Sequence, residues 1–228
     1  MIADWFNDSS IAERIAHLRQ SVPPSVRLIA VTKTVPVALM KEAYAAGIRD
    51  FGESRMQEAI AKQAAFSDCQ DIVWHWIGHL QRNKAKQAAM RFHWLHSVDS
   101  LPLAQHLNTL AAHLNNPPHI CLQVKLRSDP SKFGWSPDAL LAQLGDLKAL
   151  DGLRINGLMT LLPLNLTPEE QLAVFQETQQ LAETIRQHPH TPLPLTELSM
   201  GMSNDYPLAL QAGATMVRLG TIIFGKRQ

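Results

Sequence analysis

Eight short apolar runs, each rich in residues that favour strands, alternate along this chain with longer segments of helical spacing. Strands that are joined through helices run parallel, and eight such units close into a barrel. The sequence therefore predicts an α/β fold, a (β/α)8 TIM barrel, with strands at 26–33, 48–52, 71–78, 94–98, 119–126, 155–162, 195–200 and 215–220.

The segments between these runs carry apolar residues at intervals of three and four, which is typical of helices with one buried face. Thr167 and Glu170 have the spacing of a capping box, and Pro168 suits the first helical turn. Predicted helices include 36–46, 53–65, 101–114 and 168–187, and an extra N-terminal helix at 10–20 precedes the first strand.

An open, doubly wound sheet is the main alternative to a barrel. Such a sheet would be expected to carry a phosphate loop early in the chain, and neither GxGxxG nor GxxxxGK[ST] occurs in this sequence. The chain has 228 residues, and its proline-rich patches lead directly into the next predicted strand. We therefore expect a single domain that spans residues 1–228.

Charge and composition exclude several classes of function. The net charge of +1 gives no argument for a nucleic-acid or anionic-membrane partner. The longest apolar runs, such as 158–164, are too short to cross a bilayer, and the first ten residues lack the basic and apolar regions of a signal peptide. Cys69 and Cys121 form no disulfide or metal pattern, so we expect a cytoplasmic protein.

The functional groups of a (β/α)8 barrel gather at the carboxyl ends of its strands, and the turns after the last two strands commonly bind phosphate. In this chain those turns read SMGMSND and GT, so Met200, Gly201, Met202, Ser203, Gly220 and Thr221 are candidate phosphate ligands. Asn204 is expected to cap the helix that follows. Glycine permits close approach of a ligand, and backbone N–H groups and hydroxyls supply donors.

Lys33 is the candidate reactive residue, because it ends the strand at 26–33. Barrel closure would place that strand beside the one at 215–220, and Arg218 alternates with apolar Val217 and Leu219, so it should point into the barrel. A lysine beside a fixed cation is driven toward its neutral amine, the form that attacks an aldehyde. A lysine, an arginine and a phosphate site together suit a phosphorylated aldehyde such as pyridoxal 5'-phosphate.

Each of these signs also has a plainer interpretation. Lys33 alone could be a solvated charge at a strand end, Arg218 a structural ion pair, and SMGMS an ordinary glycine turn. Their joint occurrence at one rim of one barrel favours the cofactor site. A metal site is disfavoured, because His75, His79, His93 and His96 have no consistent ligand spacing.

The sequence resembles the pyridoxal phosphate homeostasis protein family, the relatives of the alanine racemase N-terminal domain. The likeness is carried by AVTKTVP (30–36), FGESRMQEA (51–59), WHWIGHLQRNK (74–84) and the stretch LSMGMSNDYPLALQAGATMVRLGTIIFG (198–225). It covers nearly the whole chain, and its C-terminal stretch is long and specific.

The resemblance implies a fold type III barrel with pyridoxal phosphate bound covalently to Lys33. It also implies an arginine, Arg218, at the pyridine nitrogen, and phosphate contacts from the SMGMS turn and from Gly220 and Thr221. Two positions depart from the family pattern, since Ser54 and Lys125 stand where the family usually has asparagine. Contacts made by those asparagines cannot be transferred to this chain.

The sequence favours a carrier over an enzyme. An arginine at the pyridine nitrogen leaves that nitrogen unprotonated and weakens carbanion stabilisation. The resembling racemases use a second base from a β-rich domain, which we do not expect here. We therefore expect a monomeric protein of pyridoxal phosphate homeostasis, with cofactor-accepting apoenzymes as partners. A weakly active pyridoxal-phosphate amino-acid racemase, or a Schiff-base aldolase for a sugar phosphate, are the alternatives.

Overall fold

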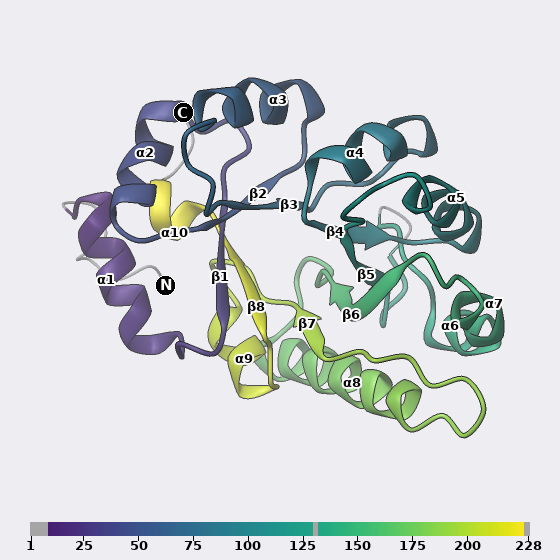
Figure 1. The fold of residues 1–228 in the computed structure, drawn as a ribbon. Helices are drawn as coiled ribbons and strands as arrows, with labels where there is room; N and C mark the ends of the chain where they lie inside the picture. The colour runs from purple at the N-terminus through teal and green to yellow at the C-terminus, as the bar shows by residue number, and fades with distance from the viewer. Residues whose placement is uncertain (1–8, 130–131, 226–228) are drawn as a thin grey trace.

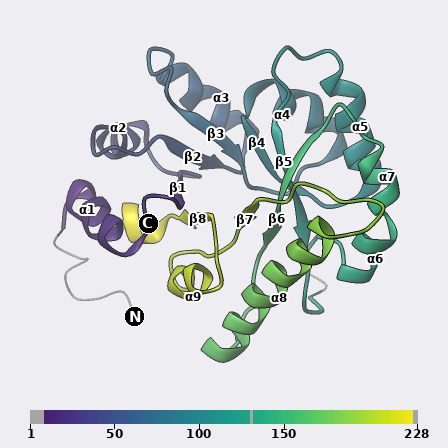
Figure 2. The same ribbon diagram turned by 60° about the horizontal axis from the view of Figure 1, so that its bottom comes forward.

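A computed structural model of the protein describes residues 9–129 and 132–225, and its strands form one closed parallel barrel in the order β1 to β8. The helices lie around the outside of this barrel (Figures 1 and 2). The strands are β1 (Arg27–Val31), β2 (Asp50–Glu53), β3 (Val73–Trp76), β4 (Trp94–Val98), β5 (His119–Val124), β6 (Arg154–Thr160), β7 (Glu197–Ser199) and β8 (Met216–Leu219).

Closure of the barrel is made by β1 and β8, which pair in parallel. All eight predicted strands are present, and the (β/α)8 prediction is confirmed. The strand predicted at 26–33 ends earlier, at Val31, because the chain turns at Lys33 and Thr34. The strand predicted at 48–52 runs from Asp50 to Glu53, so Glu53 belongs to the sheet.

The helices that connect the strands include the predicted N-terminal helix. Their bounds are α1 (Ile11–Ser21), α2 (Val37–Ala45), α3 (Met56–Ala65), α4 (Ala85–Arg91), α5 (Leu101–Ala111), α6 (Pro137–Ala142), α7 (Leu144–Lys148), α8 (Pro168–Arg186), α9 (Tyr206–Gln211) and α10 (Thr221–Phe224), with a 3-10 turn, η2 (Arg82–Lys84). Helices α4, α6, α7 and α10 were not among the predicted ranges.

Local sequence signals account for several helix ends. The predicted capping box of Thr167 and Glu170 is present at the start of α8. The prediction that Asn204 caps α9 is wrong, because Asp205 holds the N-cap position. The Asp205 carboxylate instead accepts the backbone N–H of Met202, so it stabilises the preceding turn.

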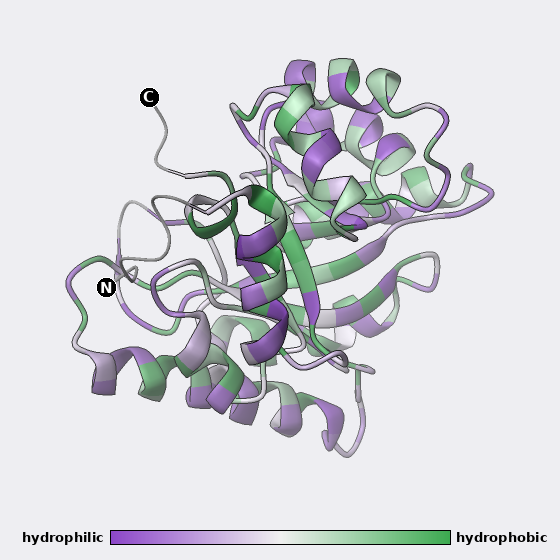
Figure 3. Ribbon diagram, turned by 90° about the vertical axis from the view of Figure 1, so that its left-hand side faces the viewer, coloured by the Kyte–Doolittle hydropathy of each residue, from purple (hydrophilic) through white to green (hydrophobic). Residues whose placement is uncertain are grey.

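Apolar residues pack on both sides of the sheet. A small cluster that includes Ile29, Trp94, Cys121, Met159 and Met216 is separate from the main core, which lies largely between strands and helices. Figure 3 shows hydrophobic and hydrophilic colours along both the strands and the surrounding helices. This two-sided burial is typical of parallel strands.

The described part of the chain contains no helix of the length and apolar character that crossing a bilayer requires. Within residues 9–129 and 132–225 there is also no group of three or more histidine, cysteine, aspartate or glutamate side chains placed to hold a metal ion.

Candidate functional site

Lys33 lies in a turn directly after β1 and is half-buried. The next residue, Thr34, has a φ of 62°, a left-handed conformation that is costly for a β-branched residue. Its backbone N–H donates to Glu58 Oε2 at 2.8 Å, and its hydroxyl donates to the Lys33 carbonyl at 2.6 Å. The position of Lys33 is therefore imposed by specific contacts of its turn.

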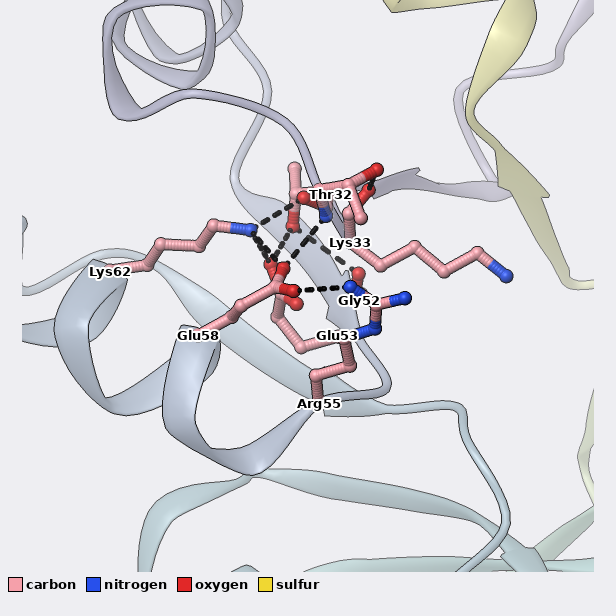
Figure 4. Close-up of polar contacts among 8 residues, drawn as sticks. Thr32, Lys33, Gly52, Glu53, Arg55, Glu58 and Lys62 are labelled. Carbon is pink, nitrogen blue, oxygen red and sulfur yellow. Dashed lines mark hydrogen bonds and ion pairs between the residues drawn. The ribbon is translucent and has the colours of Figure 1, made fainter. Parts of the chain in front are cut away.

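A buried ion cluster lies beneath this turn (Figure 4). The Lys62 ammonium donates to Glu53 Oε1 at 2.8 Å and to the Thr32 carbonyl at 2.6 Å, and it lies 3.4 Å from Glu58 Oε2. The Thr32 hydroxyl also donates to Glu53 Oε1, at 2.6 Å. Lys62 is 6% exposed and Glu53 is 0% exposed, so each charge depends on the other.

Figure 4 shows the Lys33 side chain extending away from Lys62, on the other side of the Lys33 turn. The cluster therefore holds the backbone on both sides of Lys33, while the Lys33 amine lies outside the cluster. This support was not predicted from the sequence. One sequence feature indicated part of it: Glu58 and Lys62 are four residues apart on a predicted helix, a spacing that favours an ion pair.

Arg218 points into the barrel, as its alternation with Val217 and Leu219 predicted, and is 3% exposed. Its guanidinium donates to Ser199 Oγ at 2.6 Å and to the Thr160 carbonyl at 2.8 Å. Burial lowers the pKa of Arg218 to about 10, and the charges of nearby acidic groups oppose this shift. The side chain remains a cation at neutral pH, held by neutral oxygen atoms.

Lys33 and Arg218 come from paired strands, as predicted, but not from the same level of the barrel. Arg218 lies opposite Ile29, four residues before Lys33. The strand ends at Val31 and the chain then turns, so the register does not place the two residues directly opposite each other. That their side chains lie beside each other stays a prediction.

The turn after β7 contains Met200, Gly201, Met202 and Ser203. Gly201 has a φ of 92°, and a Cβ there would lie 2.6 Å from that of Ala209, so another residue would be strained. Met200 is buried, whereas Met202 is 40% exposed. Asp205 accepts the Met202 N–H at 2.6 Å, and burial raises the pKa of that carboxyl despite the opposing bond.

The turns after β7 and β8 meet through Ser203. Its hydroxyl oxygen accepts the N–H groups of Gly220 at 3.3 Å and of Ile222 at 3.4 Å. Thr221 begins α10 between them and is half-buried. These hydroxyls and backbone N–H groups form a donor set of the kind that binds phosphate, so the residues present fit a phosphorylated cofactor.

The two positions that depart from the family pattern have specific surroundings. The Lys125 ammonium donates to the carbonyls of Asp129 and Lys132, at 3.4 and 3.3 Å, and so holds the loop after β5. Ser54 follows β2 and packs so closely on Gly78 that a Cβ at Gly78 would lie 2.6 Å from that of Ser54. Neither contact reproduces an asparagine amide.

A hollow of about 620 Å³ lies at the opposite end of the barrel. Its lining includes Arg27, Val73, Trp94, His119 and Glu197, which are the first residues of five strands. Barrels of this type carry their chemistry at the carboxyl ends, where Lys33 and Ser203 lie. We therefore place the functional site at the carboxyl ends and not in this hollow.

Comparisons with known proteins show which family this chain resembles. A family model described as the alanine racemase N-terminal domain matches residues 7–228. The pyridoxal phosphate homeostasis protein of Synechocystis sp. is 51% identical over 222 residues, which are 97% of this chain and 99% of that protein. The protein of the same name from Pseudomonas aeruginosa is 41% identical, over 97% of this chain and 94% of its own length.

A solved structure of PipY from Synechococcus elongatus, with PLP bound, superimposes with a TM-score of 0.90 at 51% identity. The match covers 95% of this chain and 100% of that chain. This chain is therefore similar to these proteins in both sequence and fold over nearly its whole length. This chain belongs to the pyridoxal phosphate homeostasis protein family, whose barrel is that of the alanine racemase N-terminal domain.

Proposed function

We propose that this chain binds pyridoxal 5'-phosphate through Lys33 and serves its homeostasis in the cell. The observation that carries this proposal is that the candidate site residues lie on or directly after three adjacent strands, β7, β8 and β1. Ser203 and Gly220 link the turns of the first two, Arg218 projects from the second, and Lys33 follows the third. Relatives that match nearly the whole chain, at 51% and 41% identity, carry the matching name.

Lys33 is the proposed covalent ligand. The Lys33 amine would hold the cofactor at its aldehyde carbon, and the aldehyde oxygen would be released as water. The left-handed Thr34 and the Glu58 contact hold the Lys33 turn in place for this step. When bound, the cofactor supplies an electrophilic aldehyde and a ring that can withdraw electrons.

The phosphate is proposed to lie between the two glycine-containing turns. The Gly201 backbone and the Ser203 hydroxyl would face it from β7, beside Met200 and Met202, whose N–H groups donate to Met216 O and to Asp205 Oδ1. Gly220 and Thr221 would face it from β8. Arg218 is proposed to face the ring nitrogen. As a permanent cation that donates but does not accept hydrogen bonds, Arg218 disfavours protonation of that nitrogen.

We propose that the bound cofactor is stored and passed on without turnover. The tyrosine hydroxyls, which are candidate second bases, are engaged elsewhere. Tyr44 donates to Asp71 at 2.7 Å on the outer surface, and Tyr206 lies 3.3 Å from Ser21 Oγ at the end of α1. We further propose a monomer in the cytoplasm that delivers the cofactor to apoenzymes.

An absorbance spectrum of the wild type and of Lys33→Ala tests the function. The purified or reconstituted wild type should be yellow and lose the visible band on substitution, and Lys41→Ala, at an exposed site on α2, should keep it. Borohydride reduction followed by peptide mass spectrometry should place a pyridoxyl group on Lys33. A wild type that is colourless after incubation with the cofactor and removal of the unbound excess, or a sugar adduct on Lys33, would overturn the proposal.

A further inference from the structure

A chain of hydrogen bonds runs through the interior of the barrel. Asp50 Oδ1 lies 2.9 Å from His75 Nε2, and His75 Nδ1 lies 2.9 Å from His96 Nε2. His96 Nδ1 lies 2.8 Å from Ser199 Oγ, which accepts from Arg218 Nη1 at 2.6 Å. His75, His96 and Ser199 are fully buried, so no solvent competes for these bonds.

The bond between His96 and Ser199 crosses the barrel. His96 belongs to β4 and Ser199 to β7, and β5 and β6 separate these two strands in the closed sheet. This chain of hydrogen bonds therefore connects one wall of the barrel with the opposite wall. It begins near the amino end of β2, at Asp50, and ends at the cation that we place at the cofactor ring.

The chemistry of the two ends determines the direction of every bond. Arg218 can only donate, and an ionised Asp50 can only accept. A neutral His75 must therefore carry its proton on Nε2, which leaves Nδ1 as an acceptor. His96 then donates from Nε2 and accepts at Nδ1 from the Ser199 hydroxyl, whose lone pair receives the Arg218 N–H.

The local electrostatics agree with this assignment. Burial lowers the pKa of His75 and lowers that of His96 well below its usual value, so both rings are neutral at physiological pH. Burial alone would raise the pKa of Asp50, but the hydrogen bonds from His75 and Arg27, together with the charge of Arg27, lower it overall. Arg27 donates to Asp50 at 2.9 Å and closes that end of the chain.

We propose that Asp50, His75, His96 and Ser199 are positioning residues, which fix the Arg218 guanidinium through a single oriented hydrogen-bond chain. The Thr160 carbonyl supplies the second anchor, from β6. A guanidinium held by two oxygens on different strands keeps one plane and one depth in the barrel. The role in cofactor binding rests on the proposed function. The donor-to-acceptor direction of the hydrogen bonds does not.

Nitrogen-15 NMR of the histidine side chains, recorded on the full chain without added cofactor, tests the orientation. His75 and His96 should both appear as neutral Nε2–H tautomers between pH 6 and 8. Ser199→Ala should move the His96 Nδ1 resonance, because that nitrogen loses its donor. An Nδ1–H tautomer or a charged ring at either histidine would overturn the proposal.

Titration with pyridoxal phosphate tests the effect on Arg218. Ser199→Ala should weaken binding about tenfold, as expected when a buried hydrogen bond to a charged group is lost. Ser199→Thr restores the hydroxyl and should recover most of the affinity. Thr178→Val removes a fully buried hydroxyl from α8 and serves as the matched control, with no expected change in affinity or in histidine signals.

The outcomes of the two experiments are distinguishable. If the wild type binds no pyridoxal phosphate, the proposed function fails, while the NMR result still decides the orientation of the chain. If the wild type binds and Ser199→Ala binds equally well, the positioning role is wrong and the proposed function stands.

Discussion

Thr34 donates its backbone N–H to Glu58 Oε2 at 2.8 Å, so a carboxylate on α3 restrains the residue that follows Lys33. Thr34 has a φ of 62°, a conformation that costs on the order of 1–3 kcal/mol and persists only where its surroundings enforce it. Glu58 also pairs with Arg55 at 2.8 Å. Glu58 is therefore one of two contacts of α3 with the Lys33 turn, the other being the bond from Lys62 to the Thr32 carbonyl.

Glu58→Ala should lower the free energy of unfolding by about 1–2 kcal/mol, because the Thr34 N–H loses its acceptor. The same change should slow formation of the visible band when pyridoxal phosphate is added. Urea unfolding and stopped-flow absorbance measure the two effects. Glu42→Ala, at an exposed position on α2, is the control, and an equal effect there would contradict the role given to Glu58.

The buried pair of Glu53 and Lys62 should show strong coupling. Lys62→Met leaves the Glu53 carboxylate buried without its 2.8 Å partner, which should cost about 3–5 kcal/mol of unfolding free energy. Adding Glu53→Gln should recover part of that loss, because the uncompensated charge is removed. Chemical unfolding of the two single variants and the double variant gives the coupling. Additive losses would show that the pair contributes no specific interaction.

The barrel and the three parts of the site were predictable from the sequence because they depend on local patterns. Strand-like runs and helical spacing identify the elements, and parallel closure then brings β8 next to β1. The turns that hold Lys33, Ser203 and Gly220 follow strands directly. Their place at one rim is therefore a consequence of topology.

The supporting contacts were not predictable, because they depend on register and on side-chain direction. Arg218 lies opposite Ile29 and not opposite Lys33, a difference set by the stagger between β1 and β8. His96 reaches Ser199 across the barrel, and their separation of 103 residues has no sequence signal. Asp205 bonds backward to Met202, which the sequence did not distinguish from capping by Asn204.

Acid should destabilise the protein, because His75 and His96 bind protons in the unfolded chain but are kept neutral by burial in the folded protein. Burial lowers the pKa values of His75 and His96 from 6.5, so below pH 6.5 the unfolded state binds protons that the folded state does not. The free energy of unfolding should therefore fall as pH falls from 6.5 toward 5. Each histidine can contribute at most about 1.4 kcal/mol per pH unit to the slope.

Urea unfolding at several pH values measures this slope. His96→Gln should reduce it by the share of one histidine, while His113→Gln, at an exposed site, should leave it unchanged. A stability that does not change between pH 7 and 5 would show that neither histidine is held neutral in the folded state.

Gly201 should tolerate no side chain. Gly201→Ala would place a Cβ 2.6 Å from the Ala209 Cβ at a φ of 92°, and should cost about 1–3 kcal/mol of unfolding free energy. Gly145→Ala is the matched control, because no atom lies within 4 Å of a Cβ there and the residue is in α7. That substitution should stabilise by about 0.5–1 kcal/mol. Thermal unfolding compares the two.

Tyr206 is the tyrosine near the proposed phosphate site, and its hydroxyl lies 3.3 Å from Ser21 Oγ and not toward the barrel interior. If that hydroxyl were the second base of a racemase, Tyr206→Phe would abolish exchange of the amino-acid α-proton with D₂O. We expect instead that the wild type exchanges no faster than free pyridoxal phosphate, because Arg218 disfavours the protonated ring that stabilises a carbanion. Tyr206→Phe should then leave both the exchange rate and cofactor binding unchanged. Proton NMR of alanine in D₂O measures the exchange, and a wild-type rate above that of free cofactor that falls in Tyr206→Phe would establish an enzyme.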